Sequence, residues 1–357
     1  MTRLDVLPYP VVIDERVAAH VAEFVRGRGR PRCVVLADRN VAGRAQSVAR
    51  ALGKGTLLLD FALGERRKTL RTLKTVLTAL AAAGADRATT LVGVGGGVAG
   101  DLFGFAAATY MRGVPFINIA TSLVAMVDAA IGGKTGVDLT AGKNLAGTFR
   151  DPVGVFCDLD ALADLPERYA REGLAELVKH AIIEGGDAFE ALETLAPHAL
   201  HKWPWETIIA ESVRIKAMYV AEDRLEAGAR EVLNLGHTFA HAIESVSRYR
   251  VSHGAAVSIG LRGAGLLALR TGRFSEAEHL RVLALLTLLR LPLVVPTDDV
   301  DGLLAAMAHD KKARAGTLRF VVPRALGDVE YGVSATARTV RAVLQRLPSL
   351  PGISELR

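Results

Sequence analysis

The chain has 357 residues, of which 50% are hydrophobic, so it is long and apolar enough to form two domains with separate cores. Its two cysteines, Cys33 and Cys157, form no disulfide framework, and the charged residues Arg3 and Asp5 are not followed by the apolar run of a secretion signal. No uninterrupted apolar stretch is long enough to span a bilayer. We therefore expect a cytoplasmic protein without a membrane partner.

The charge balance indicates what kind of partner to expect. Lysine and arginine total 44 and aspartate and glutamate total 38, which gives a formal net charge of +6. Basic and acidic residues are interspersed, and only 5% of residues are aromatic, so the stacking residues of nucleic-acid-binding surfaces are scarce. A site for an anionic small molecule explains the positive excess equally well. We expect a small-molecule partner and no nucleic acid.

Up to about residue 160, short β-rich runs alternate with helical stretches. The expected strands are 11–13, 33–36, 56–59, 90–94, 116–119 and 153–156. This alternation predicts a mainly parallel sheet covered by helices. We therefore assign residues 1–160 to an α/β nucleotide-binding domain.

After residue 160, helical periodicity dominates through about Leu289. Only 320–322 and 329–331 have the pattern of short strands. We expect residues 161–357 to form a mainly helical domain of the all-α class. This domain would bind a metal and the substrate, with the site in the cleft between the two domains.

A glycine cluster, Gly93–Asp101, follows the fourth expected strand and leads into a helical run. Glycines at such a turn let a phosphate approach backbone N–H groups at a helix N-terminus. Gly95, Gly97 and Gly100 match G-x-G-x-x-G, but no acidic residue lies about twenty positions further on, so the match alone is weak. A tight turn that binds no ligand would show the same pattern. Asp38, at the end of an earlier strand, is a candidate for holding an adenosine ribose, which favours NAD over NADP.

Three side chains form a set suited to a divalent metal. Glu176 offers an oxygen and His237 and His253 offer imidazole nitrogens, which leaves a coordination position open for a substrate. His237 and His241 share one helix face, and Glu176 and Lys179 share another. Histidines hydrogen-bonded within a core are the alternative. A ligand pair formed by His237 and His241, as in His-Glu-x-x-His sites, is a weak alternative because threonine replaces the catalytic glutamate.

Several cationic and polar side chains fall within or beside glycine-rich or motif-like segments. Single lysines are usually solvated, but lysines within 131–136 and 141–145 are less easily explained in this way. If such groups converge, they would bind a substrate with more than one negative charge, and arginine would suit a planar carboxylate. The group comprises Arg112, Lys134, Lys143, Asn144, Lys179, Lys216, Arg230, Lys311 and Lys312.

Further ordered motifs extend over most of the chain. They are Gly95–Asp101, Tyr110–Pro115, Val127–Thr135, Gly142–Asn144, Gly173–Lys179, Asn234–Glu244, His253–Gly254 and Asp310–Lys312. From about Asp38 to Lys312 the chain resembles 3-dehydroquinate synthases and their sugar-phosphate cyclase relatives, and this motif set is highly specific. The resemblance implies an NAD- and zinc-dependent lyase of the shikimate route to aromatic amino acids. Such an enzyme converts 3-deoxy-arabino-heptulosonate 7-phosphate to 3-dehydroquinate and phosphate by transient oxidation, phosphate elimination, re-reduction and intramolecular aldol closure.

The resemblance also assigns roles to individual positions. It makes Glu176, His237 and His253 the ligands of zinc, or of cobalt or another divalent metal. The NAD site would be lined by Asp38, Glu65, Lys68, Gly95, Gly96, Gly97, Asp101, Thr121, Ser122, Lys134 and Lys143. The substrate, a phosphorylated sugar acid, would be surrounded by Asp128, Lys134, Lys143, Asn144, Lys179, Lys216, Glu226, Arg230, Asn234, His241 and one of Lys311 and Lys312. Arg112 would reach the phosphate bound in a neighbouring subunit, so the resemblance implies a homodimer.

Alternatives remain for the substrate and the reaction. Lys216, Arg230 and Asn234 are intact at carboxylate-binding positions, which favours a carboxylate substrate over relatives that cyclise substrates without one. A 3-amino-dehydroquinate synthase or another cyclase of secondary metabolism would satisfy the same residues. A metal- and NAD-dependent polyol dehydrogenase would share the layout, whereas a non-catalytic relative would be expected to have lost part of the set.

Three features of the sequence depart from the family pattern. Ala255 stands where an acidic residue is usual, which removes a candidate partner for the zinc site. Asp164 stands where a small hydroxyl residue is common, and residues 120–122 read Ala-Thr-Ser instead of Pro-Thr-Thr or Pro-Thr-Ser. None of the three is an assigned metal ligand.

Overall fold

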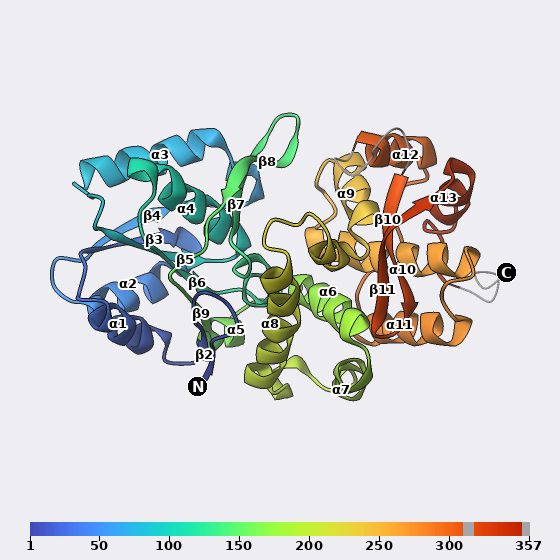
Figure 1. Ribbon diagram of the computed structural model, residues 1–357, viewed down its shortest axis with the longest axis horizontal. Helices are drawn as coiled ribbons and strands as arrows, with labels where there is room; N and C mark the ends of the chain where they lie inside the picture. The colour runs from blue at the N-terminus through green and yellow to red at the C-terminus, as the bar shows by residue number, and fades with distance from the viewer. Residues whose placement is uncertain (310–317, 352–357) are drawn as a thin grey trace. The chain divides into compact units, whose positions relative to one another are not determined.

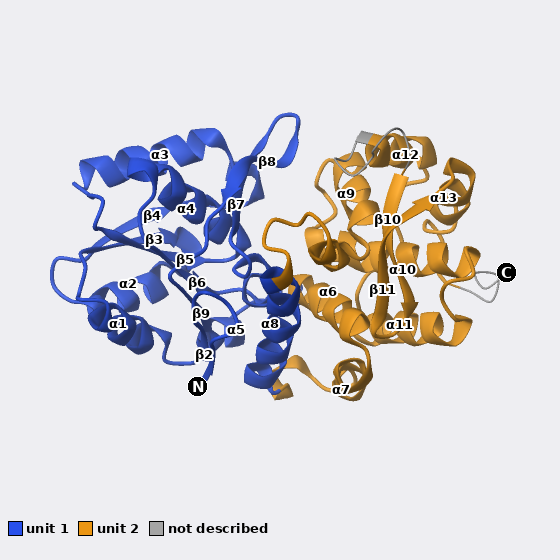
Figure 2. Ribbon diagram, viewed as in Figure 1, with its two compact units in different colours: residues 1–170, 204–221 blue, residues 171–203, 222–357 orange. Residues whose placement is uncertain are grey.

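The computed structural model describes residues 1–309 and 318–351, and the chain divides into two compact units (Figure 2). Unit 1 contains residues 1–170 and 204–221, and unit 2 contains residues 171–203 and 222–357. The chain returns to unit 1 at residues 204–221, so a single boundary near residue 160 does not describe this division. Within the described ranges, no helix is both long and apolar enough to cross a membrane.

Unit 1 is built on a seven-stranded sheet with the order β1-β2-β9-β6-β5-β3-β4 (Figure 1). The strands are β1 (Thr2–Leu4), β2 (Val11–Asp14), β3 (Cys33–Asp38), β4 (Leu57–Phe61), β5 (Thr90–Gly95), β6 (Phe116–Ala120) and β9 (Gly154–Asp158). Only β1, at one edge, pairs antiparallel with its neighbour; all other pairs are parallel. The mainly parallel sheet expected from the sequence is confirmed, and each of its six expected strands is present.

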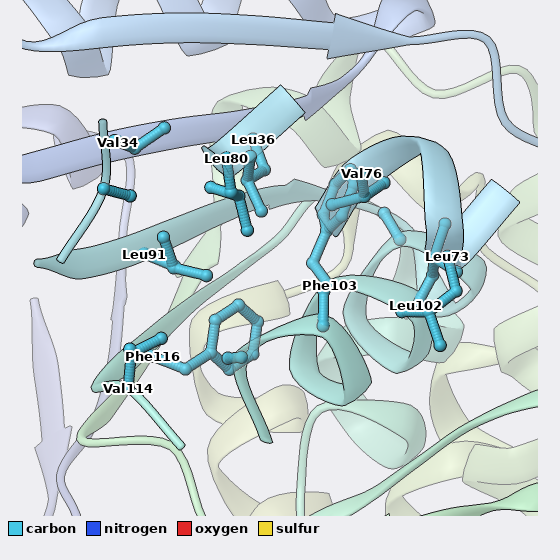
Figure 3. Close-up of a cluster of buried hydrophobic side chains, with 14 of the residues drawn as sticks. Val34, Leu36, Leu73, Val76, Leu80, Leu91, Leu102, Phe103, Val114 and Phe116 are labelled. Atoms are coloured by element: carbon cyan, nitrogen blue, oxygen red, sulfur yellow. The ribbon is translucent and has the colours of Figure 1, made fainter. Parts of the chain in front are cut away.

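Helices cover both faces of this sheet. On one face, α1 (Val17–Gly27) and α2 (Ala42–Leu52) pack on a core that includes Val35 and Val92. On the other, α3 (Leu70–Ala82) and α4 (Gly97–Thr109) pack on a core that includes Leu36 and Phe103, drawn in Figure 3. Because side chains alternate along a strand and both faces are covered, the central strands are apolar at successive positions.

A hairpin, a π-helical turn and two further helices also belong to unit 1. An antiparallel hairpin of β7 (Lys134–Leu139) and β8 (Gly142–Phe149) follows the π-helical turn η4 (Ala125–Ala129). The short helix α5 (Leu159–Ala163) follows β9, and α8 (Trp205–Glu222) is the returning helix. The hairpin was not expected, because its strands are largely half-buried or exposed and lack a clean apolar alternation.

Unit 2 is mainly helical, as expected. Its helices are α6 (Glu167–Glu184, whose first turn lies in unit 1), α7 (Gly186–Leu195), α9 (His237–Val246), α10 (His253–Arg270), α11 (Glu276–Leu288), α12 (Val300–His309) and α13 (Ala337–Leu344). An antiparallel pair, β10 (Leu318–Ala325) and β11 (Asp328–Ala335), contains the two short strands expected from the sequence. α10 is buried along most of its length, so it is the central helix of the unit.

Two glycines let α9 and α10 meet backbone to backbone. A Cβ atom at Gly260 would overlap the carbonyl oxygen of Gly236, and one at Gly236 would lie 2.9 Å from the amide nitrogen of Leu261. Gly236 also has a left-handed φ of 78°, which favours glycine directly before the first residue of α9. This close packing fixes the start of α9, where His237 lies.

Candidate active site

Three helices of unit 2 bring together the predicted metal ligands. Glu176 lies within α6, while His237 and His253 are the first residues of α9 and α10. Oε1 of Glu176 lies 3.1 Å from Nε2 of His253 and 3.6 Å from Nε2 of His237. One ligand atom from each residue lies within 4.8 Å of the others, a spacing that could hold a metal ion. The structure groups His237 with His253 and Glu176, which favours this set over a pair formed by His237 and His241.

Each histidine has its second ring nitrogen near an oxygen acceptor. Nδ1 of His237 lies 3.2 Å from the backbone oxygen of Leu235, and Nδ1 of His253 lies 3.5 Å from Oε1 of Glu244. When Nδ1 carries the proton, the lone pair of Nε2 is directed toward Glu176. Such acceptors commonly orient imidazoles that bind metals.

The pKa values of the two imidazoles are shifted in opposite directions. Burial and then the Lys179 ammonium group lower the pKa of His237 well below its ordinary value. Burial also lowers the pKa of His253, but the carboxylates of Glu176 and Glu244 outweigh it and raise that pKa to about 10. A cation bound at this position would therefore replace the proton of His253, because a metal ligand must be the neutral imidazole.

Other predicted residues of unit 2 lie beside the metal ligands in space or a few positions before His237 in the sequence. Nζ of the buried Lys179 lies 2.5 Å from Oε2 of Glu176, and the ring of the exposed His241 is centred 5.5 Å from that of His237. Arg230 is buried and donates from Nη1 to the backbone oxygen of Arg224 at 2.7 Å.

The segment before α9 contains an amide–carboxylate contact between two of the predicted substrate residues. Asn234 donates from Nδ2 to Oε1 of Glu226 at 2.6 Å. Asn234 ends the 3₁₀ segment η6 (Ala229–Asn234), and Glu226 has a left-handed φ of 59°.

The predicted nucleotide site lies at the carboxyl ends of the strands of unit 1. From β3 the chain passes to β4 on one side and then to β5 on the other, so the strand order reverses between β3 and β5. In open α/β sheets, ligands bind outside the carboxyl ends at such a point. Asp38 ends β3 and Gly95 ends β5, so both predicted residues lie at this edge.

The glycines at this edge lie close to neighbouring side chains. A Cβ atom at Gly95 would overlap Cβ of Ala99 and lie 3.4 Å from Cβ of Asp38, and one at Gly96 would lie 3.1 Å from Oγ of Ser122. Gly96 is the N-cap of α4 and Gly97 its first residue, so bare backbone N–H groups begin the helix. The buried Thr121 donates its N–H to the backbone oxygen of Gly95 at 3.0 Å.

A second polar cluster in unit 1 is centred on the buried Lys68. Its Nζ lies 2.5 Å from Oδ2 of Asp101 and 2.5 Å from Oδ1 of Asn144. Burial raises the pKa of Asp101 despite the opposing effect of Lys68, and the pKa of Lys68 is also raised because Asp101 outweighs the effect of burial. Lys143 forms an ion pair with Glu65 at 2.8 Å. The structure thus brings together five residues that the sequence analysis assigned to NAD or substrate.

The remaining predicted residues include one further contact pair. Lys216 on α8 contacts Asp128, and Lys134 is exposed at the start of β7. Arg112 is exposed in a turn, with a left-handed φ of 68°. Lys311 and Lys312 lie outside the described residues.

Sequence reasoning missed two acidic residues at these clusters. Glu244 follows His237 and His241 on the same face of α9, and this spacing could have identified it. Asp138 accepts the backbone N–H of Asn144 through Oδ1 at 2.8 Å and donates its own backbone N–H to the oxygen of Lys68 at 2.8 Å. No signal in the sequence pairs these segments, because the contact depends on the unexpected hairpin.

Comparison with known proteins identifies relatives over almost the whole chain. Residues 58–172 match the family model for the 3-dehydroquinate synthase N-terminal region, and residues 173–313 match that for the C-terminal region. A 3-dehydroquinate synthase from Acidithiobacillus ferrooxidans is 39% identical over 348 residues, covering 94% of this chain and 96% of its own.

Two solved structures have the same fold. A 2-epi-5-epi-valiolone synthase from Streptomyces hygroscopicus subsp. jinggangensis, with NAD+ and Zn2+ bound, gives a TM-score of 0.86 at 29% identity over 97% of this chain and 98% of its own. A 2-deoxy-scyllo-inosose synthase complexed with carbaglucose-6-phosphate, NAD+ and Co2+ gives 0.86 at 26% identity over 96% and 99%.

Proposed function

This chain belongs to the 3-dehydroquinate synthase family, and we propose that it converts 3-deoxy-arabino-heptulosonate 7-phosphate to 3-dehydroquinate and phosphate. It is accordingly an enzyme of the phosphate-eliminating lyase class. The observation that carries the proposal is the meeting of Glu176, His237 and His253, residues far apart in the sequence, within the part of the chain matched by the C-terminal family model. The reaction belongs to the shikimate route.

The donor set fits a divalent cation. One carboxylate oxygen and two imidazole Nε2 atoms converge, and the opposite ring nitrogens face Leu235 and Glu244. We favour zinc, because it accepts nitrogen and oxygen donors and keeps a position open for substrate. The two solved relatives with Zn2+ and Co2+ support a divalent ion here. When bound, the ion polarises a substrate carbonyl oxygen, which acidifies the adjacent carbon.

The glycine turn after β5 fits a dinucleotide, because it leaves bare backbone where a Cβ atom would collide. The N–H groups that begin α4 would bind the pyrophosphate, and the Asp38 carboxylate would accept hydrogen bonds from the adenosine ribose. Thr121 and Ser122, at the end of the adjacent β6, would line the same edge. NAD bound here would accept a hydride from the substrate and return it within the same turnover, so that no net oxidation results.

The remaining polar side chains would bind and orient the substrate. Arg230 would grip its carboxylate with the two-pronged guanidinium group, assisted by Lys216 and by the amide of Asn234. Lys179 would stabilise negative charge near the bound cation, and His241 would carry protons. This carboxylate-binding set supports a sugar acid, although an amino analogue of the same acid would satisfy it as well.

We further propose a cytoplasmic homodimer in which Arg112 contributes to the neighbouring subunit's phosphate site. The exposed position of Arg112 and its left-handed backbone support this role, because strained residues are retained mainly where a function requires their conformation. Lys311 or Lys312 would supply a further cation for the phosphate.

The experiment that tests the function measures three compounds separately. The protein is incubated with the heptulosonate phosphate, zinc and a catalytic amount of NAD, and phosphate, 3-dehydroquinate and NADH are measured. Phosphate and 3-dehydroquinate should form in equal amounts without accumulation of NADH. NADH formed in proportion to product would support the polyol dehydrogenase reading, and faster turnover of sedoheptulose 7-phosphate, which lacks the carboxylate, would place the chain with the carboxylate-independent cyclases.

A further inference from the structure

The helix that carries His253 begins without an acidic residue of its own. The N-cap residue of α10, Ser252, makes no side-chain capping hydrogen bond, and no aspartate or glutamate lies in the first turn. The first N–H groups of any helix lack partners within the helix and carry the positive end of its dipole. An acceptor for these groups must come from elsewhere.

Glu172 on α6 supplies this acceptor. Its Oε2 accepts the backbone N–H of Gly254, the second residue of α10, at 2.6 Å. A Cβ atom at Gly254 would collide with the Cα atom, carbonyl carbon and oxygen of Glu172. The first turn of α10 therefore rests directly on the backbone of α6, and a charge-assisted hydrogen bond holds it there.

The same face of α6 carries the candidate metal ligand. Glu172 and Glu176 are four residues apart, so their side chains lie one helical turn from each other. Glu172 holds Gly254, while Glu176 lies 3.1 Å from Nε2 of the preceding residue, His253. A displacement of Gly254 relative to Glu172 would move His253 relative to Glu176.

We propose that Glu172 is a positioning residue for the metal site, a role that rests on the proposed function. It fixes the start of α10 so that Nε2 of His253 meets the same point as the donors of Glu176 and His237. Glu172 itself contributes no ligand atom.

The test uses Co2+ as the probe, because both its affinity and its visible absorption report on coordination. Glu172→Ala should weaken Co2+ binding, measured by competition with a chelator, by about 10- to 100-fold and should alter the absorption spectrum of the bound ion. Glu172→Gln keeps an oxygen acceptor but loses the charge, so its affinity should fall between those of the alanine variant and the parent protein. The matched control is Glu184→Ala, which removes an exposed glutamate from the same helix and should bind Co2+ like the parent.

A purely structural role would lower the melting temperature of the metal-free protein and leave Co2+ affinity and spectrum unchanged. Glu172→Ala with parental affinity and spectrum overturns the proposal. If that variant does not fold, Glu172→Gln decides by the same criterion. Parent protein that binds no Co2+ would instead refute the metal site itself, so the two failures are distinguishable.

Discussion

Lys216 and Asp128 form a close ion pair within unit 1. Nζ of Lys216 lies 2.6 Å from Oδ1 of Asp128 and 2.6 Å from its backbone oxygen. The lysine is buried on α8, and the aspartate belongs to the π-helical turn before β7. A residue proposed to bind substrate thus also ties the returning helix to its unit, so substitutions there should affect both activity and stability.

Lys216→Met should lower kcat/KM by about ten- to a hundred-fold, since a charged contact to the substrate is lost. It should also lower the free energy of unfolding by about 1–3 kcal/mol, because the half-buried Asp128 loses its ammonium partner. Steady-state kinetics and urea unfolding measure the two effects. Lys202→Met, at an exposed lysine, is the control, and parental kinetics in Lys216→Met would rule out a role in binding.

His237→Ala should remove most of the bound metal and abolish turnover, because only Glu176 and His253 would remain as ligands. Metal content after dialysis and the rate of phosphate release are the measurements. His201→Ala, at an exposed histidine, should change neither. A His237→Ala protein with full metal content and parental rate would refute the central assignment.

Gly95→Ala should weaken NAD binding by at least about tenfold, because the new Cβ would overlap Cβ of Ala99 and shift the start of α4 at the nucleotide edge. NAD affinity is measured by calorimetry. Gly43→Ala is the matched control, since a Cβ there meets no atom within 4 Å and alanine suits the first turn of α2, where Gly43 lies. Equal NAD affinity in Gly95→Ala and Gly43→Ala would argue against the glycine turn as the site.

His279 should make the stability of the protein depend on pH. Burial and then the nearby Arg262 lower the pKa of His279 to about 4 from its ordinary value of 6.5, so the unfolded chain takes up the proton first as pH falls. Stability is therefore fully present above pH 6.5 and is lost as pH falls toward 4, by about 2 kcal/mol between pH 7.5 and pH 5.

His279→Leu should remove this component. Urea unfolding of the metal-free parent and variant at both pH values isolates it, because the other titrating groups are common to the two proteins. If the difference in free energy of unfolding between parent and variant is the same at pH 7.5 as at pH 5, His279 does not titrate in this way.

Mixed dimers test the proposed sharing of Arg112. Arg112→Ala and Lys179→Ala should each be inactive alone, but a mixture should recover part of the activity, because a hybrid dimer contains one site with both residues intact. Phosphate release after subunit exchange is the measurement. No recovery, with exchange demonstrated by differently tagged subunits, would contradict sharing.

The sequence predicts the sheet of unit 1 well because its strands are buried on both faces and therefore read as apolar runs. It does not predict the β7–β8 hairpin, whose residues are largely half-buried or exposed. The hydrogen bonds of Asn144 with Lys68 and with Asp138 depend on this hairpin, so no periodicity in the sequence predicts them.

The metal ligands are predictable as residue types, but their meeting point is not. Helical spacing relates His237 to His241, whereas the other two residues whose ligand atoms converge with His237 are Glu176 and His253, which come from two other helices. The approach of α10 to α6 depends on the absence of a side chain at Gly254, a tertiary contact that local propensity does not encode.

The return of α8 to unit 1 limits how this protein can be divided. The two family regions meet between residues 172 and 173, but α8, at residues 205–222, packs in the unit that precedes this boundary. A fragment ending at residue 172 would lack one of the helices of unit 1. The complementary fragment would carry that helix, whose buried residues include Ile209 and Val213, without the unit to which it belongs. If one half were exchanged at this boundary for the half of an unrelated protein, α8 would no longer meet the surface that receives it. An exchange of either half would therefore have to keep α8 matched to the unit in which it packs.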